Sequence, residues 1–316
     1  MSEFRLTKPV VFIIFNRPNT TERVFREIAK AKPSKLFVIS DGPREGHPEE
    51  GIIVAKTRKI IEKVDWPCDL KLNFSQSNQG CGKRLHSGLN WVFDEVEQAI
   101  ILEDDCLPGK DFFRFCEEML DKYADCDDLG MVNGINVLEN QISIAESYYF
   151  SKYAHVWGWA TWRRVWQKYD FNLSEWPHFK KNNTIDTLFK KKSERRYWTK
   201  AFDLTYSRGI DTWDYQLAFT FFKYSLLSIT PNRNLISNIG FGPNATHTKM
   251  LNRTANMPVD LLSFPLNHPS ELRINEDADR ITSDLFYDSP SILQLAIRSI
   301  HTSALMRATH LIKKLI

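Results

Sequence analysis

Short apolar runs alternate with segments of helical periodicity over the first hundred residues. The apolar runs cover residues 9–15, 36–40, 70–74 and 100–102, and helical spacing of apolar residues appears at about 20–30, 49–64 and 83–96. Strands that alternate with helices pair in parallel, because each helix carries the chain back along the sheet. The sequence therefore predicts an α/β protein with a mostly parallel central sheet flanked by helices.

Three adjacent carboxylates, Glu103, Asp104 and Asp105, stand at the end of the fourth apolar run. Adjacent acids repel one another where the dielectric constant is low, so a cation among them would relieve the repulsion. Carboxylate oxygens suit Mg²⁺ or Mn²⁺, and such ions commonly bridge to the phosphates of a substrate. The alternative is a solvated acidic turn before a helix, since acids are favourable near a helix start.

Polar side chains also follow the first two strands. Asn16 and Arg17 come after the first strand, and Asp41 comes after the second. The carboxyl ends of parallel strands meet at one edge of a sheet, so a ligand site is expected there. Arg17 could bind a phosphate, and Asp41 could accept a hydrogen bond from a sugar hydroxyl or a base. A surface ion pair for Arg17 and a plain turn at Asp41 are the alternatives.

A glycine-containing loop, NQGCGKR at residues 78–84, follows the third strand. It could supply Lys83 and Arg84 to a ligand, or it could simply cap the next helix. The first strand is followed neither by a P-loop with its lysine nor by a dinucleotide-binding fingerprint. Phosphate binding of those two classes therefore has no support in the sequence.

The second half of the chain contains two further features. Residues 148–166 are rich in tryptophan, and most of these rings are expected in the core rather than on a sugar-binding surface. Asp214 precedes an apolar, helix-like run, so its carboxylate could cap that helix or serve as a general base. Residues 231–247 predict a strand and then a loop with two glycines, a form suited to closing over a substrate.

The composition is that of an ordinary globular protein, with 316 residues, 42% of them hydrophobic and 26% charged. A net charge of +3 and aromatic residues that lie mostly outside the basic runs argue against a nucleic-acid partner. The five cysteines are odd in number and lack the close spacing of zinc ligands, which indicates free thiols in a reducing compartment. A cytoplasmic location is expected, because the N-terminus has no secretory character.

The chain ends in a basic segment with helical periodicity from Ser291 to Ile316, which has no acidic residue. This helix could lie on an anionic membrane surface and hold the protein at the inner face of a membrane. It could equally pack on the domain or pair with another subunit. The preceding residues 251–290 are rich in proline and polar residues, so an irregular tail is expected there.

Several motifs occur in an order that resembles the GT-A glycosyltransferases, most closely those of the N-acetylglucosaminyltransferase I type. They are FNRP, SDGP, ILEDDCLPGKDFFRFCEEML, GWATW, TWDYQL and PNRNLISNIGFGPNATHT, and they extend over roughly residues 10–247. The resemblance implies a GT-A domain over residues 1–250, with a nucleotide-sugar half at about 1–130 and an acceptor half at about 131–250. Tyr215 stands where the family has a second acid.

The resemblance also implies a role for each matching residue. Asp105 would be the side chain that binds Mn²⁺, with Mg²⁺ as the alternative ion, and this acidic motif would be of the DXD type. Asp214 would be the catalytic base that accepts a proton from the acceptor hydroxyl, and the loop from Ser237 to His247 would order over the donor. The donor nucleotide sugar would be bound by Asn16, Arg17, Asp41, Arg84, Glu103, Asp104 and His247.

The main hypothesis is therefore an inverting, metal-dependent glycosyltransferase. It would move a hexosyl or N-acetylhexosaminyl group from a nucleotide-sugar donor, a UDP-sugar above all, to a carbohydrate or lipid-linked acceptor in surface polysaccharide or glycolipid synthesis. A sugar nucleotidyltransferase is the second hypothesis, although the basic, glycine-rich signature of such enzymes is missing after the first strand. A non-catalytic protein that binds a membrane surface through Ser291 to Ile316 is the third.

Overall fold

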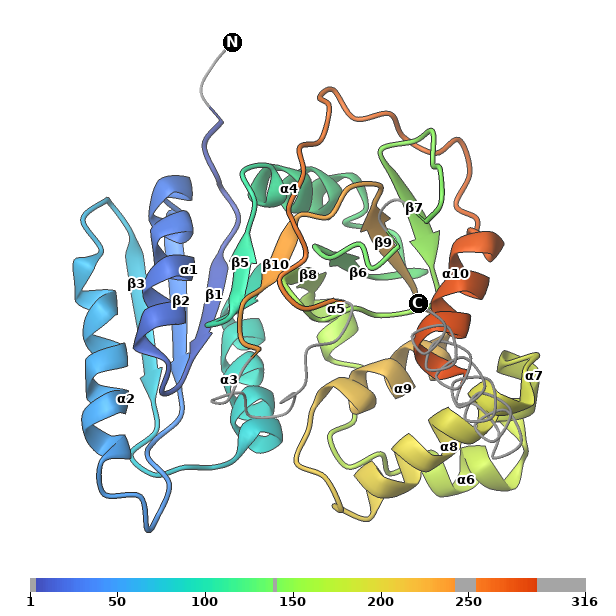
Figure 1. The fold of residues 1–316 in the computed structure, drawn as a ribbon, viewed down its shortest axis with the longest axis horizontal. Helices are drawn as coiled ribbons and strands as arrows, with labels where there is room; N and C mark the ends of the chain where they lie inside the picture. Colours follow the sequence, from blue (N-terminus) through green and yellow to red (C-terminus); the bar gives the residue numbers. More distant parts are fainter. Residues whose placement is uncertain (1–3, 139–140, 242–253, 289–316) are drawn as a thin grey trace, which may run out of the picture.

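The computed structural model describes residues 4–138, 141–241 and 254–288, so His247 and the segment from Ser291 to Ile316 lie outside the described residues. The nucleotide-sugar half predicted from the sequence begins with four strands separated by helices (Figure 1). These elements are β1 (Val10–Ile14), α1 (Pro18–Ala31), β2 (Lys35–Ser40), α2 (Glu50–Arg58), η1 (Lys59–Lys63), β3 (Asp69–Phe74), α3 (Cys81–Glu95) and β4 (Gln98–Glu103).

Shorter strands and most of the helices follow β4. The first group is β5 (Cys106–Pro108), α4 (Phe112–Lys122), β6 (Leu129–Asn133), β7 (Tyr148–Ser151), β8 (Trp159–Trp162) and α5 (Arg163–Trp166). The second group is α6 (Trp176–Lys181), α7 (Thr184–Leu188), α8 (Lys192–Tyr206), α9 (Asp214–Tyr224), β9 (Leu227–Pro231), β10 (Ile236–Asn238), α10 (Glu276–Thr282) and the π-helical turn η2 (Ser283–Tyr287).

One large sheet joins the two halves, with the strand order β3-β2-β1-β4-β8-β6-β9-β7. The first four of these strands run parallel, β8 is antiparallel to both β4 and β6, and β7 is antiparallel to β9. The predicted α/β class is confirmed, but the sheet is mixed. Its parallel half is the part formed by residues 10–103, where the strand and helix pattern was regular.

The parallel half is buried because helices cover it. β1 and β2 are almost wholly buried and contain the continuous apolar runs VVFII and LFVI, as expected for strands covered on both faces. Helix α1 turns its apolar face, which includes Val24, Phe25 and Ile28, toward this core. Pro18 at its first position suits a helix start, since that residue has no amide hydrogen to leave unpaired.

A second, aromatic core lies among helices α6 to α9, which gather below the strands of the second half in Figure 1. It contains Trp176, Phe189, Trp198, Phe202 and Phe219. For the tryptophan-rich segment, the expected place in the core is confirmed for Trp159, Trp162 and Trp166, which are at most 4% exposed, whereas Trp157 is partly exposed.

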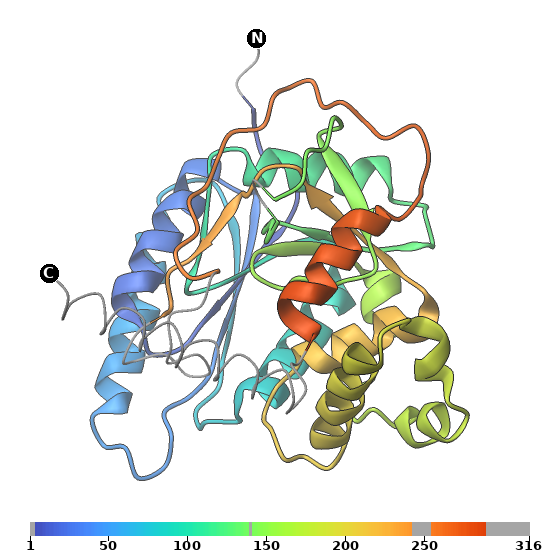
Figure 2. The ribbon, with the colours of Figure 1, turned by 45° about the vertical axis from the view of Figure 1, so that its right-hand side comes forward.

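Residues 254–288 return to the body of the protein. Figure 2 shows α10 lying across the strands of the second half, and Asn275 donates its amide hydrogen to the carbonyl oxygen of Phe150 in β7. Asp279 accepts a hydrogen bond from Ser151, and Ser283 donates one to the buried carboxylate of Glu194 in α8. The segment predicted as an irregular tail thus contains two short helical elements that pack on β7 and α8.

Two structural features bear on the cellular compartment, the state of the cysteines and the length of the helices. The cysteines Cys68, Cys81, Cys106, Cys116 and Cys126 are all free. Within residues 4–138, 141–241 and 254–288, every helix is too short or too polar to cross a bilayer.

Candidate active site at the carboxyl edge of the parallel strands

The acidic triplet lies where β4 ends, beside the end of β1. Asp104 is only 6% exposed, and its Oδ2 accepts a hydrogen bond of 3.0 Å from the amide of Phe15. The Nη1 atom of Arg17 lies 2.5 Å from Oδ2 of Asp105 and 3.6 Å from Oδ1 of Asp104. The structure therefore brings Arg17 together with Asp104 and Asp105, as the parallel pairing of β1 with β4 requires.

Negative charge in this cluster exceeds what Arg17 neutralises. Burial and then the charge of Asp105 raise the pKa of Asp104 to about 7, although Arg17 and the amide of Phe15 oppose this shift. The pKa of Glu103 is raised well above its usual value, first by burial and then by the charges of Asp105, Asp104 and Asp214. A further cation would stabilise the ionised form of these acids.

The acidic cluster fits a hard divalent cation. Its donors are carboxylate oxygens, and Asp105 keeps about 17% of its side chain exposed. In the described parts of the chain no group of three His, Cys, Asp or Glu side chains could by itself enclose a metal ion. An ion bound at Asp105 would therefore take its other ligands from a substrate or from water, as Mg²⁺ commonly does.

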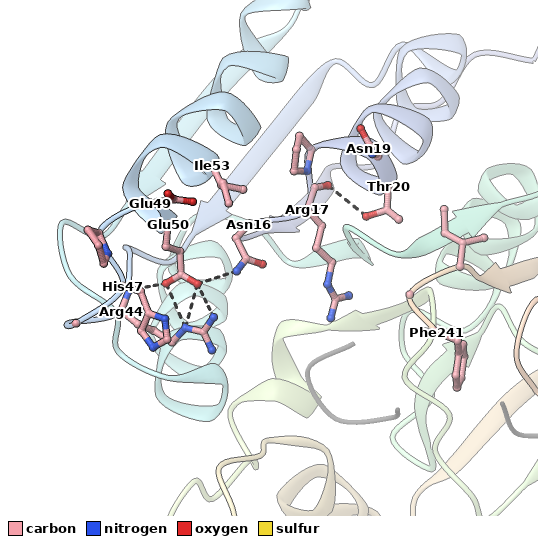
Figure 3. Close-up of a pocket in the computed structure, with 15 residues that line it drawn as sticks. Asn16, Arg17, Asn19, Thr20, Arg44, His47, Glu49, Glu50, Ile53 and Phe241 are labelled. Carbon is pink, nitrogen blue, oxygen red and sulfur yellow. Dashed lines mark hydrogen bonds and ion pairs between the residues drawn. The ribbon is translucent and has the colours of Figure 1, made fainter. Parts of the chain in front are cut away.

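A cavity of about 860 Å³ opens beside this cluster, between the first turns of α1 and α2 (Figure 3). Figure 3 shows the side chain of Arg17 extending from the start of α1 toward the side where Phe241 lies. The cavity is lined by Asn16, Arg17, Pro18, Asn19, Thr20, Arg44, Gly46, His47, Pro48, Glu49, Glu50, Ile53, Ile239, Gly240 and Phe241. Its volume is in the range of sites for small molecules and cofactors.

One wall of the cavity depends on Glu50, which the sequence did not single out. Its buried carboxylate accepts hydrogen bonds from the backbone amide and the guanidinium group of Arg44, and from Nδ2 of Asn16 at 2.9 Å. Asn16 is thereby fixed at the cavity wall. An acid at the first position of a helix is common, so its presence there does not by itself indicate this network.

Asp41 lies at the same edge and binds the loop that follows β3. Its two carboxylate oxygens accept hydrogen bonds from the amide of Gln79, at 3.0 and 3.1 Å, and Oδ1 also accepts one from Gly42. Burial raises the pKa of Asp41, and these amides oppose the shift. Asp41 is almost wholly buried, with 7% of its surface exposed.

Arg84 is buried beneath this edge. Its guanidinium group donates to the carbonyl oxygens of Ser40 and Asn73 and to the side chain of Asn73. The structure thus uses Arg84 to tie together the ends of β2 and β3. Among the site residues expected from the sequence, Arg84 and Asp41 support the edge of the sheet, whereas Asn16 and Arg17 line the cavity.

The start of α3, which follows the glycine-containing loop after β3, is capped by a distant residue. Asp211 accepts hydrogen bonds from the amides of Cys81, at 2.8 Å, and Gly82, at 2.9 Å. The cap of α3 is therefore Asp211 and not a side chain of the loop, and a ligand contact of Lys83 stays a prediction. Sequence reasoning missed Asp211, because nothing local signals a contact across 130 residues.

Asp214 is the first residue of α9, and its charge contributes to the raised pKa of Glu103 in the acidic cluster. Its Oδ1 accepts hydrogen bonds from the hydroxyl of Thr212 and the amide of Tyr215. The preceding Trp213 stacks on Trp159 of β8 with 5.6 Å between ring centroids. A carboxylate held in this way at a helix start could accept a proton from a hydroxyl group.

The segment after β10 lies over Asp105. The amide of Ile239 donates to the carbonyl oxygen of Asp105, at 2.8 Å. A Cβ atom on Gly240 would collide with the carboxylate of Asp105, so only glycine permits this approach. Described residues of the predicted closing loop therefore reach the acidic cluster, and the rest of that loop, with His247, lies outside the described residues.

No family model matches the sequence, and no curated protein matches it either. Solved structures that it resembles include a Pyrobaculum calidifontis mannosyltransferase in complex with GDP-Man and Mn²⁺, at 15% identity over 69% of this chain and 70% of that one, with a TM-score of 0.40. Residues 1–349 of S. aureus TarS match at 12% identity over 73% and 60%, with a TM-score of 0.40.

A third structure, GalNAc-T7 with UDP, GalNAc and Mn²⁺, matches at 10% identity over 73% of this chain and 43% of that one, with a TM-score of 0.43. All three TM-scores are below 0.5. The assignment of a function therefore rests on the site itself.

Proposed function

We propose that this chain is a metal-dependent glycosyltransferase of the GT-A type that moves a sugar from a nucleoside-diphosphate donor to an acceptor hydroxyl with inversion. The observation that carries the proposal is the meeting of Arg17 with Asp104 and Asp105 beside a cavity of about 860 Å³, with Asp214 acting on the same cluster. The motifs EDDCLPGKDFF and TWDYQL support it from the sequence. A UDP-sugar is the donor we favour.

The donor would lie in the cavity, with its diphosphate toward Arg17. The guanidinium group of Arg17 can donate two parallel hydrogen bonds to phosphate oxygens. Asn16 would contact the nucleoside from the cavity wall, while Asp41, Glu103 and Asp104 would hold the surrounding loops and strand ends in place. A Mn²⁺ or Mg²⁺ ion held by Asp105 would supply positive charge for the departing diphosphate.

Asp214 would act on the acceptor. Its carboxylate takes the proton of the acceptor hydroxyl while that oxygen attacks the anomeric carbon. The bond from that carbon to the diphosphate oxygen breaks on the opposite face, and the nucleoside diphosphate leaves. One displacement of this kind inverts the anomeric configuration.

Two substitutions separate donor binding from transfer. Asp105→Ala should abolish the thermal stabilisation by UDP, GDP or CDP that depends on Mn²⁺, because ligand binding to the folded state is what raises the melting temperature. Asp214→Asn should keep that stabilisation and lower the transfer rate by about 10²–10⁴-fold, the usual contribution of a general base. Asp277→Asn, which changes an exposed acid of a surface pair with Arg280, is the matched control.

Metal-dependent stabilisation that persists in Asp105→Ala would contradict the donor site, and full transfer by Asp214→Asn would remove the proposed base. The wild-type protein should also be given a nucleoside triphosphate with a sugar phosphate. Release of pyrophosphate in that mixture would favour the sugar nucleotidyltransferase instead.

A further inference from the structure

The N-terminus of α3 is filled by a carboxylate of the chain itself. Oδ2 of Asp211 lies 2.8 Å from the amide nitrogen of Cys81, and Oδ1 lies 2.9 Å from that of Gly82. Free amides and the helix dipole make such a helix start attractive to anions. Asp211 is solvent-exposed and lies just before α9, so this contact joins the nucleotide-sugar half to the segment that carries Asp214.

Two glycines at the start of α3 make this close contact possible. Gly80 has a φ of +83°, and a Cβ atom there would lie 2.6 Å from Oδ2 of Asp211. A Cβ atom on Gly82 would collide with the carbonyl oxygen of Thr212. The glycine spacing of the loop therefore accommodates the segment that begins at Asp211.

A short series of contacts continues from Asp211 to Asp214. The hydroxyl of Thr212 donates to Oδ1 of Asp214, and the carbonyl oxygen of Thr212 accepts a hydrogen bond of 2.8 Å from Nε2 of Gln216. Tyr169 donates its hydroxyl hydrogen to the carbonyl oxygen of Trp213, at 3.1 Å. The position of the Asp214 carboxylate thus depends on a segment that Asp211 fixes at one end.

The charges of Glu103, Asp211 and Asp214 all act on the thiol of Cys81, at the start of α3. Burial raises the pKa of the Cys81 thiol, and the charges of Glu103, Asp211 and Asp214 raise it further. Cys81, at the start of α3, therefore lies within electrostatic reach of both the acidic cluster and the proposed base. A displacement of the 211–214 segment would change the position of Asp214 relative to Glu103.

We infer that Asp211 is a positioning residue, whose contact with the start of α3 sets the position of Asp214 for proton transfer and leaves donor binding unaffected. This inference rests on the proposed glycosyl transfer. The competing explanation is a helix cap that contributes only stability, on the order of 1 kcal/mol. The two explanations differ in kcat, because a cap alone has no effect on the position of a base.

The test compares Asp211→Ala and Asp211→Asn with a capping variant elsewhere. Asn275→Ala is the control, because Oδ1 of Asn275 caps α10 through the amide of Ala278 at 2.9 Å, at the end of α10 that is hydrogen-bonded to Phe150 of β7. For Asp211→Ala we expect kcat of transfer to fall about 10–100-fold, since small misplacements of a catalytic group have effects of this size. The KM for the nucleotide sugar and the stabilisation by nucleotide with Mn²⁺ should stay within about twofold of wild type.

Asp211→Asn keeps an acceptor oxygen and should lose less of kcat, and it serves as the second variant if Asp211→Ala does not fold. Asn275→Ala should lower the melting temperature with kcat within about twofold of wild type. A normal kcat in both Asp211 variants, or an equal loss of donor binding, would overturn the positioning role. A wild-type protein that transfers no sugar would overturn the proposed function first, so the two failures are distinguishable.

Discussion

Two helices, α1 and α3, each follow a parallel strand and begin at the same edge of the sheet, yet their N-termini differ. The first turn of α1 lines the large cavity, with Arg17 extending beside Asp104 and Asp105. The first turn of α3 is closed by the carboxylate of Asp211. A helix N-terminus attracts an anion in either case. At α1 it lines a cavity that could hold a ligand, whereas at α3 the anion is a carboxylate of the chain itself.

The difference was not apparent from the local sequences. Residues 78–84, around the start of α3, contain two glycines, a lysine and an arginine, whereas α1 follows Arg17, starts with Pro-Asn and contains no glycine. Glycines allow a close approach of any group, and at Gly80 and Gly82 that group is the chain itself. A glycine-rich helix start therefore indicates a close contact without indicating whether the partner is a ligand.

Replacement of Arg17 is the strongest challenge to this comparison. Arg17→Met should weaken binding of a nucleoside diphosphate in the presence of Mn²⁺ by about 100-fold, because charge-assisted hydrogen bonds to phosphate are lost. Mn²⁺ alone should bind at least as tightly as to wild type, since Asp105 loses a competing cation 2.5 Å away. Calorimetric titrations with the ion alone and with the nucleotide measure both affinities.

Arg26→Met is the control for Arg17→Met, because Arg26 lies on the same helix with 68% of its side chain exposed and pairs only with Glu22 among the described ion pairs. Unchanged nucleotide affinity in Arg17→Met would remove α1 from the donor site. The comparison with α3 would then lose its functional meaning.

The substitution Gly82→Ala tests the start of α3. Gly82→Ala should push the 211–214 segment away from α3, because the new Cβ atom meets the carbonyl oxygen of Thr212. We expect a loss of about 1–3 kcal/mol in the free energy of unfolding, typical of overpacking, and a fall in kcat of about tenfold. Denaturant unfolding and steady-state transfer assays measure the two effects.

Gly51→Ala provides the contrast, since Gly51 lies in α2 and a Cβ atom added there would have no neighbouring atom within 4 Å. The free energy of unfolding of that variant should rise by up to about 1 kcal/mol, because alanine is a better helix former than glycine. A Gly82→Ala protein that is destabilised but turns over normally would show that the contact at α3 has no influence on Asp214.

The sequence predicted the parallel half of the fold well because its signals are local. A short window of sequence is enough to recognise the apolar runs of β1, β2 and β4 and the helical spacing of α1 and α3. The proximity of Arg17 to Asp104 and Asp105 was also predictable from the sequence, because parallel strands bring their carboxyl ends to one edge of the sheet.

Contacts over long distances in the sequence could not be predicted in the same way. Asp211 caps a helix that begins 130 residues earlier, and Asp41 binds the amide of Gln79, which follows 38 residues later. The strands of the second half are three to five residues long, and strands so short show little periodicity. The order of these strands in the sheet depends on packing between distant parts of the chain. A short segment of sequence does not contain that information.

The start of α2 gives the smallest expected effect. Its first residue, Glu50, accepts hydrogen bonds from Asn16 and Arg44 within the cavity wall. Burial raises the pKa of Glu50, but hydrogen bonds from Arg44 and Asn16 more than offset this, so the pKa lies below 4.5. The folded state therefore binds the proton less tightly than the unfolded chain. Glu50 contributes stability above about pH 4.5, and this contribution is lost as the pH falls through the lower pKa of the folded state.

Glu50→Gln should be less stable than wild type by about 1–2 kcal/mol at pH 7, as expected for hydrogen bonds to a buried charged group. The difference should shrink as the pH falls below 4.5, because wild type then loses the same interactions. Denaturant unfolding at about pH 7, 5 and 4 measures it, with the exposed neighbour Glu49→Gln as control. A difference that stays constant with pH would mean that the ionised carboxylate does not maintain this wall, and that the cavity beside α1 depends on packing alone.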